Sequence, residues 1–170
     1  MATIPRVSLD EYLNTDYEPD CEYIEGALED RNVGKRKHSE TQALLCALLL
    51  AARDKHFHRV LPEQRVQISH SQVRIPDLCL VRKEDSDEVI KAPPALWIEI
   101  LSPEDRWSRV QTKLADVLHF GVPTVWVIDP YSRQAWMATH ETALFEITDG
   151  VLRCTNPSLE ISLEAVLPQD

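Results

Sequence analysis

The chain has 170 residues, 44% hydrophobic and 27% charged, which is typical of a globular protein and predicts a single domain over residues 1–170. Its formal net charge of −10, from 18 basic and 28 acidic residues, argues against a protein that coats nucleic acid by bulk positive charge. The longest apolar stretch, residues 43–52, is too short to span a bilayer, so no membrane association is expected.

The cysteine pattern and the start of the chain both favour a reducing compartment. No CxxC spacing occurs, and Cys46 and Cys79 lie in apolar runs where a reduced thiol simply packs. Residues 1–10 contain no apolar core of a signal peptide. We therefore expect free thiols and a cytoplasmic location.

The first third of the chain predicts a short helix, a hairpin and a long helix. The pattern Ser8–Glu11 is a capping box that opens a helix to about residue 14. Residues 20–30 carry a strand–turn–strand pattern. Ser39 is the expected cap of a long helix over residues 40–56, which is apolar nearly all round and should be well covered by other elements.

The remainder predicts a mixed sheet with one crossover. Strands are expected at 59–68, 73–82, 96–101 and 123–128, and a helix ending near Gly121 lies between the last two. A strand–helix–strand step of this length requires parallel strands in one sheet. We expect an α/β (α+β) fold with an αβββαβ core, and weaker strands at 134–138, 144–147 and 152–154.

Two acidic residues lie in the middle of strongly apolar predicted strands. Asp77 follows Pro76, and Glu99 stands between Ile98 and Ile100. A buried ionised carboxylate is costly unless a cation lies beside it. A shared divalent metal held by oxygen ligands is one interpretation. Salt bridges to arginines such as Arg74 or Arg82 are the alternative.

Several short motifs follow one another in a definite order. They are Cys21-Glu-Tyr-Ile-Glu-Gly26, His38 at the long helix, Pro76-Asp77, Glu99-Ile-Leu-Ser102, Lys113, Gly121-Val-Pro123 and Trp126-Val-Ile-Asp-Pro130. Over residues 8–165 this set resembles the Uma-two restriction endonuclease family, a branch of the PD-(D/E)XK nuclease superfamily. The resemblance implies a restriction-endonuclease-like fold and an endonuclease that hydrolyses DNA phosphodiester bonds with Mg²⁺, or alternatively Mn²⁺.

The resemblance also assigns residues to roles. Asp77 and Glu99 would be catalytic metal ligands, and the main-chain carbonyl of Ile100 a further ligand. The superfamily lysine two residues after the glutamate is Leu101 here, so Lys113 on the following helix would take its catalytic role. Strand and helix rises place Lys113 level with Glu99. The alternative is a solvated lysine on an amphipathic helix.

Two more candidates carry weaker signals. Glu22 matches the acid of the family's turn and would be a third catalytic carboxylate, unless it is an exposed strand residue. His38 would contact phosphate or orient a ligand, unless it is a simple cap or surface residue. The basic cluster Arg31, Lys35, Arg36 and Lys37 is the best candidate for contact with a nucleic-acid backbone.

Other features favour a different class of function. Arg109 stands where the family has an acid, and Val117 stands where it has a tyrosine. An inactive nuclease-like domain that serves as a binding or assembly module is therefore the main alternative. A glycosidase that uses Asp77 and Glu99 as an acid/base pair is a third, although 6% aromatic residues provide little for a sugar cleft. A homodimer is expected if both strands of a duplex are cut.

Overall fold

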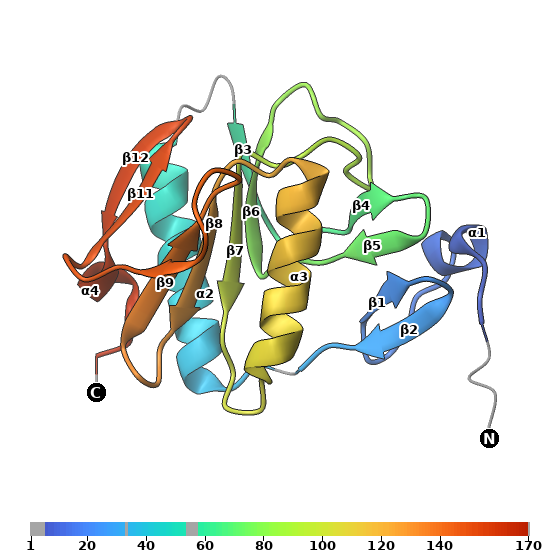
Figure 1. Ribbon diagram of the computed structural model, residues 1–170, viewed down its shortest axis with the longest axis horizontal. Helices are drawn as coiled ribbons and strands as arrows, with labels where there is room; N and C mark the ends of the chain where they lie inside the picture. The colour runs from blue at the N-terminus through green and yellow to red at the C-terminus, as the bar shows by residue number, and fades with distance from the viewer. Residues whose placement is uncertain (1–5, 33, 54–57, 170) are drawn as a thin grey trace.

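A computed structural model describes residues 6–32, 34–53 and 58–169 (Figure 1). Its helices are α1 (Leu9–Leu13), α2 (Arg36–Ala52), α3 (Trp107–Phe120) and α4 (Leu163–Val166). Its strands are β1 (Cys21–Ile24), β2 (Ala27–Asp30), β3 (His58–Pro62), β4 (Val66–Ser69), β5 (Gln72–Arg74), β6 (Leu78–Arg82), β7 (Leu96–Ile100), β8 (Val125–Asp129), β9 (Gln134–Ala138), β10 (Phe145–Glu146), β11 (Val151–Thr155) and β12 (Ser158–Ser162).

The central layer is a six-stranded mixed sheet in the order β10-β9-β8-β7-β6-β3. Strands β7 and β8, which α3 connects, run parallel, and every other neighbouring pair is antiparallel. Figure 1 shows α3 in front of this sheet and α2 behind it. The predicted mixed sheet flanked by helices and its parallel crossover are confirmed.

Alternation along the central strands creates two apolar layers. Ile98 and Ile100 pack with Leu45 and Leu49 on the α2 side of the sheet. Trp97 of the same strand packs on the opposite side, against the apolar face of α3. Successive side chains of a strand point to opposite faces, and β7 is apolar at nearly every position. Both of its faces are therefore apolar, and a helix covers each of them.

A second, four-stranded sheet, β2-β1-β5-β4, lies beside the first. The prediction that 59–68 and 73–82 are single strands of one sheet is wrong, because each breaks and its halves join different sheets. The first break follows Pro62, where Glu63 has a φ of 51°. The second contains Pro76, which has no N–H for a ladder. Asp77 is the last residue of that break, directly before β6.

The ends of the long helices differ from prediction. Helix α2 begins at Arg36, so Ser39 lies inside it, and His38 and Thr41 are buried on its first turns. The helix therefore extends N-terminal to the predicted cap, because its first turns carry side chains that are buried in the protein. Predicted helix residues 54–56 lie outside the described part of the chain. The predicted helix start at Ser8, whose side chain accepts from the Glu11 N–H, and the left-handed Gly121 C-cap, with a φ of 107°, are confirmed.

The C-terminal segment covers α2 in a way that the sequence did not predict. Strands β11 and β12 form a hairpin, and its buried residues pack into the same core cluster as Leu45 and Leu49. Strand β12 and helix α4 were not predicted. Helix α2, which was expected to be well covered by other elements, is buried along the face that carries Leu45 and Leu49, whereas Leu50 is 45% exposed. The four cysteines are free thiols, as expected, and burial raises the pKa of Cys79 to about 12.

Candidate active site

The pairing of β6 with β7 brings Asp77 and Glu99 together. Cys79 pairs with Trp97 in this antiparallel register, and extending it by two residues sets Asp77 opposite Glu99. Because side chains alternate between the two faces of a strand, both acids lie on the sheet face that α3 covers, where Cys79 and Trp97 also pack. The two carboxylates therefore face the same space between sheet and helix.

Asp77 is 6% exposed and is held by three donors. Its Oδ2 accepts the Ile100 N–H at 2.6 Å. Its Oδ1 lies 3.2 Å from Nε2 of His38 and 3.4 Å from a guanidinium nitrogen of Arg31. The cation beside Asp77 is therefore Arg31, and neither of the arginines considered from the sequence fills this position.

Glu99 lies where negative charge is concentrated. Its Oε1 accepts the indole N–H of Trp97 at 2.6 Å and lies 2.7 Å from Nζ of Lys113. Burial raises the pKa of Glu99 to about 7; Lys113 opposes this increase, while the nearby Asp77 and Glu22 add to it. One lysine is thus too little positive charge to keep this carboxyl at its ordinary pKa.

Lys113 enters the site from α3 and meets three oxygens. Its Nζ lies 2.8 Å from Glu22 Oε1, 2.7 Å from Glu99 Oε1 and 2.7 Å from the Ile75 carbonyl oxygen. These contacts match the three N–H donors of an ammonium group. Burial by itself would lower the pKa of Lys113, but Glu22 and Glu99 outweigh it and raise the pKa. Lys113 is thus a buried charge and not a solvated helix residue.

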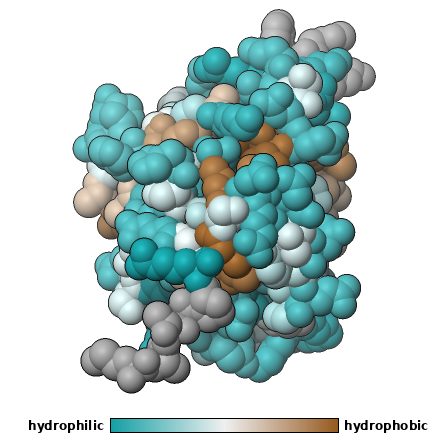
Figure 2. All heavy atoms as spheres, turned by 90° about the vertical axis from the view of Figure 1, so that its right-hand side faces the viewer, coloured by the Kyte–Doolittle hydropathy of each residue, from teal (hydrophilic) through white to brown (hydrophobic). Residues whose placement is uncertain are grey.

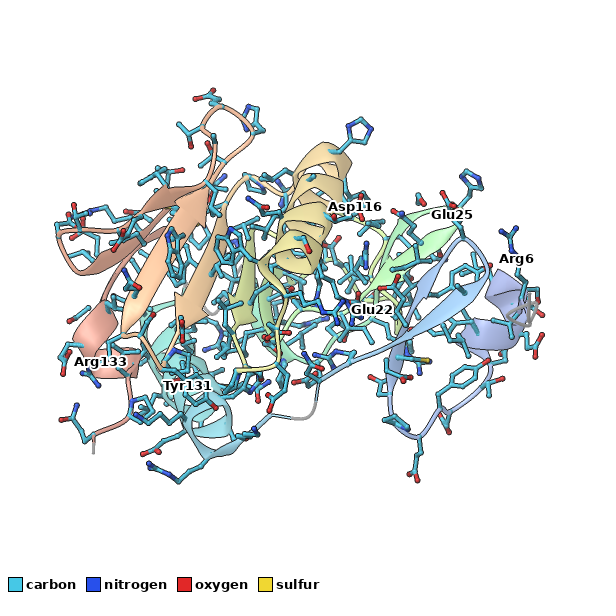
Figure 3. The ribbon with its side chains drawn as sticks, turned by 60° about the horizontal axis from the view of Figure 1, so that its bottom comes forward. Arg6, Glu22, Glu25, Asp116, Tyr131 and Arg133 are labelled. Atoms are coloured by element: carbon cyan, nitrogen blue, oxygen red, sulfur yellow. The ribbon has the colours of Figure 1, made fainter. Side chains whose placement is uncertain are left out.

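Glu22 reaches the site from β1 in the smaller sheet (Figure 3). It is 2% exposed, so the alternative of an exposed strand residue is wrong. Its Oε1 also accepts the Ile75 N–H at 2.9 Å, and its Oε2 accepts from Arg74 at 2.8 Å. Burial would raise the pKa of Glu22, but Lys113 and Arg74 outweigh it and lower the pKa to about 2. Glu22 is therefore firmly ionised.

His38 lies in the first turn of α2 and is 7% exposed, so it is not a surface residue. Burial would lower the pKa of His38, but Asp77 outweighs it and raises the pKa. The Nδ1 atom of the ring faces Gly34, where an added Cβ would lie only 2.6 Å away. The ring fits beside Asp77 because residue 34 has no side chain.

All five predicted catalytic side chains line one pocket. The predicted main-chain ligand, Ile100, lines the same pocket. The complete lining is Glu22, Arg31, Asn32, His38, Asp77, Glu99, Ile100, Leu101, Ser102, Asp105, Arg109, Val110 and Lys113. Figure 2 looks at the end of the molecule that carries α1, β1 and β2, and shows a mostly hydrophilic surface with a narrow apolar band at its centre.

Hydrogen bonds and an ion pair connect residues at and near the rim of this pocket. Asn32 donates to Asp105 at 2.6 Å, and Lys35 forms an ion pair with Glu104. Arg109 donates to the Asp30 carbonyl oxygen at 2.8 Å. The predicted basic cluster is thus largely neutralised by neighbouring acids, since Arg31 pairs with Glu63 and Arg36 with Glu40.

Three side chains of the site were not among the predicted catalytic residues. Trp97, which donates to Glu99, lies two residues before it, so strand alternation indicates that they share a face. Arg31 was predicted only as a member of the basic cluster. Arg74 was considered as a partner of the strand acids, whereas it pairs with Glu22 and Asp116. The first pairing depends on β1 and β5 being neighbours in the smaller sheet, and the second depends on that sheet lying beside α3.

The residues present fit a hard divalent cation. Asp77 and Glu99 supply carboxylate oxygens to one pocket, and oxygen ligands are those that Mg²⁺ and Mn²⁺ prefer. The raised pKa of Glu99 indicates that this part of the site lacks positive charge. Within the described ranges, no group of three or more His, Cys, Asp or Glu side chains is arranged to hold a metal ion.

The fold and the site together define a restriction-endonuclease-like protein, with acids on neighbouring central strands and a lysine beside them. The family model for Uma2, described as "Putative restriction endonuclease", matches residues 9–169, and the chain belongs to this family. Restriction-endonuclease-like families typically use divalent metals. A crystal structure of "a putative nuclease belonging to DUF820" from Anabaena variabilis is similar, with a TM-score of 0.82 and 22% identity over 94% of this chain and 97% of that chain.

At that identity the crystal structure supports the fold only. No curated protein sequence is similar enough to this chain to count as a match. Among the helices of the described ranges, none is both long enough and apolar enough to cross a membrane.

Proposed function

We propose that this protein is an endonuclease that hydrolyses DNA phosphodiester bonds with Mg²⁺, or alternatively Mn²⁺, as its cofactor. The observation that carries the proposal is the meeting of Asp77, Glu99 and Lys113 in one pocket of a Uma2-family chain. A site that served only the fold would have no need to place two acids and a lysine on a face otherwise filled by apolar residues.

Asp77 and Glu99 would hold the cation, with the main-chain carbonyl of Ile100 as a further ligand. A bound divalent ion lowers the pKa of a water molecule and neutralises charge on the scissile phosphate. Its charge would also favour the ionised form of Glu99, whose pKa is otherwise about 7. The Ile100 N–H and His38 fix the orientation of the Asp77 carboxylate.

Lys113 and Arg31 supply positive charge on either side of the two acids. Lys113 would stabilise negative charge that develops on the phosphate, without being a metal ligand. Arg31, at 3.4 Å from Asp77, would contact a neighbouring phosphate of the strand. An acidic chain with a net charge of −10 would need these local cations and the metal to bind DNA.

The second candidate function is a catalytically inactive nuclease-like module that binds or assembles with a partner. The ion pairs that neutralise the basic cluster favour it, because a cation already paired with an acid gains less from a phosphate. The homodimer expected for cutting both strands, and the single-domain organisation over residues 1–170, stay predictions.

The test combines nicking of supercoiled plasmid DNA in Mg²⁺ or Mn²⁺ with calorimetric titration of the same metals. We expect the wild type to bind metal and nick DNA, and Asp77→Asn to lose both. Asp149→Asn is a matched control, because Asp149 pairs with Arg153 on the exposed hairpin. Metal binding without nicking of any DNA would favour the inactive module, and absence of binding at millimolar metal would refute the metal site.

A further inference from the structure

The Lys113 ammonium is shared by two carboxylates that come from different sheets. Glu99 belongs to β7 of the six-stranded sheet, and Glu22 belongs to β1 of the four-stranded sheet. Both use Oε1 to contact Nζ, at 2.7 and 2.8 Å. If Glu99 turned toward a metal ion, Lys113 would still have a carboxylate and the Ile75 carbonyl oxygen as partners. The lysine is therefore not dependent on Glu99 alone.

The orientation of Glu22 is fixed by Arg74. This arginine is 3% exposed on β5, and one of its guanidinium nitrogens donates to Glu22 Oε2 at 2.8 Å. The other nitrogen pairs with Asp116, which lies one turn after Lys113 on α3. Figure 3 shows Glu22 and Asp116 between β1 and α3. Arg74 thus connects β5, β1 and the helix that carries the lysine.

Both carboxylate oxygens of Glu22 accept from protein donors. Oε1 accepts from the Ile75 N–H and from Lys113, while Oε2 accepts from Arg74. A metal ligand at this position would have to give up some of these contacts in a space that leaves the side chain 2% exposed. The geometry suits a fixed counter-charge better than it suits a ligand.

We propose that Glu22 and Arg74 are positioning residues, which hold Lys113 so that Glu99 is free to bind the cation. This inference rests on the proposed function. Without the charge of Glu22, Glu99 would be the remaining carboxylate that contacts Lys113, and the lysine would compete with the metal for it. The smaller sheet therefore belongs to the active site, because it supplies the counter-charge of the lysine.

The test is a double-mutant cycle of Glu22→Gln and Lys113→Met, read by calorimetric titration with Mn²⁺ and independent of any nuclease assay. In the wild-type background we expect Glu22→Gln to weaken Mn²⁺ binding by about tenfold or more. In the Lys113→Met background, the competitor for Glu99 is absent. The same substitution should then have only the effect of removing one nearby charge.

Asp116→Asn is the matched control for that charge effect. This substitution removes the negative charge of Asp116, which also pairs with Arg74. Asp116 has no contact with Lys113 among the described ion pairs. We expect Asp116→Asn to change Mn²⁺ affinity by about twofold at most. If Glu22→Gln weakened binding equally in both backgrounds, and by more than Asp116→Asn, Glu22 would be a metal ligand and the inference would be wrong.

Arg74 provides a second test that leaves Glu22 intact, and it decides the question if Glu22→Gln does not fold. Arg74→Lys keeps a positive charge beside Glu22, whereas Arg74→Met removes it. We expect Arg74→Lys to retain Mn²⁺ affinity within about threefold and Arg74→Met to lose about tenfold. Equal losses in both variants would overturn the role of Arg74 as a charge that orients Glu22.

The results also separate this inference from the proposed function. If the wild type bound no Mn²⁺, both would be refuted. If the wild type bound Mn²⁺ but the Glu22–Lys113 cycle were additive, only the positioning role would be refuted. In an active enzyme, Glu22→Gln at saturating Mn²⁺ should recover most of its nicking rate, because Glu22 acts on metal binding, whereas Lys113→Met should not.

Discussion

Replacing Glu22 with glutamine should lower the stability of the protein at neutral pH and remove part of its sensitivity to acid. Glutamine keeps the shape of the side chain but removes the charge that faces Arg74 and Lys113. Arg74 and Lys113 would then each lose one carboxylate partner, although Arg74 would keep Asp116 and Lys113 would keep Glu99. Breaking a buried ion pair typically costs up to about 3–5 kcal/mol. The free energy of unfolding from urea titration at pH 7 measures this loss.

The pKa of Glu22 gives the magnitude and the direction of the pH effect. The pKa is lowered from an ordinary value of 4.5 to about 2 in the folded protein, and each pKa step corresponds to about 1.4 kcal/mol. Because the folded state holds this proton less tightly, the stabilisation is fully present above about pH 4.5. It should be lost as the pH falls toward 2, and it amounts to about 3 kcal/mol.

The assay is urea unfolding of the wild type and Glu22→Gln at several pH values between 6 and 2.5. The difference in unfolding free energy between them should shrink steadily as the pH falls below about 4.5. Glu164→Gln, which removes the exposed ion pair with Arg133, is the control and should follow the wild type. A constant difference between wild type and Glu22→Gln across this range would refute the reasoning.

Three further predictions concern Lys113 and two glycines. Lys113→Met should lower the rate of DNA nicking by about 10²-fold or more. It should also raise the pKa of Glu99 above about 7, which carbon-13 NMR of the labelled carboxyl would detect, and an unchanged pKa would contradict the contact between Lys113 and Glu99. Gly34→Ala should push His38 away from Asp77 and reduce the unfolding free energy by about 1–3 kcal/mol in urea titration, and wild-type stability would show that the ring has room to move. Gly121→Ala should reduce the unfolding free energy by about 1 kcal/mol or more, because the φ of residue 121 is 107°. Calorimetry should show unchanged metal affinity, because this C-cap lies at the opposite end of α3 from Trp107.

Local sequence patterns determined the elements around the site well. Alternation of apolar residues identified the central strands, and the left-handed Gly121 marked the end of α3. Two acids in such strands already indicated a site, because burial of a carboxylate needs a compensating charge. The strand and helix rises also placed Lys113 level with Glu99, and the structure sets the two groups 2.7 Å apart. These results depend on periodicity and on one short crossover, both of which are local.

Only the tertiary structure decided which charges compensate one another. Glu22 and Lys113 are separated by a large part of the chain and meet because the smaller sheet lies beside α3. The break at Pro76 that divides the two sheets was read from the sequence as a continuous strand, since each half has the same apolar alternation. Contacts between side chains of distant elements depend on how those elements pack, and periodicity along the chain carries no information about that. The sequence by itself therefore identified Asp77, Glu99 and Lys113, whereas the packing of the smaller sheet beside α3 decided that Glu22 and Arg74 are the charges that accompany the lysine.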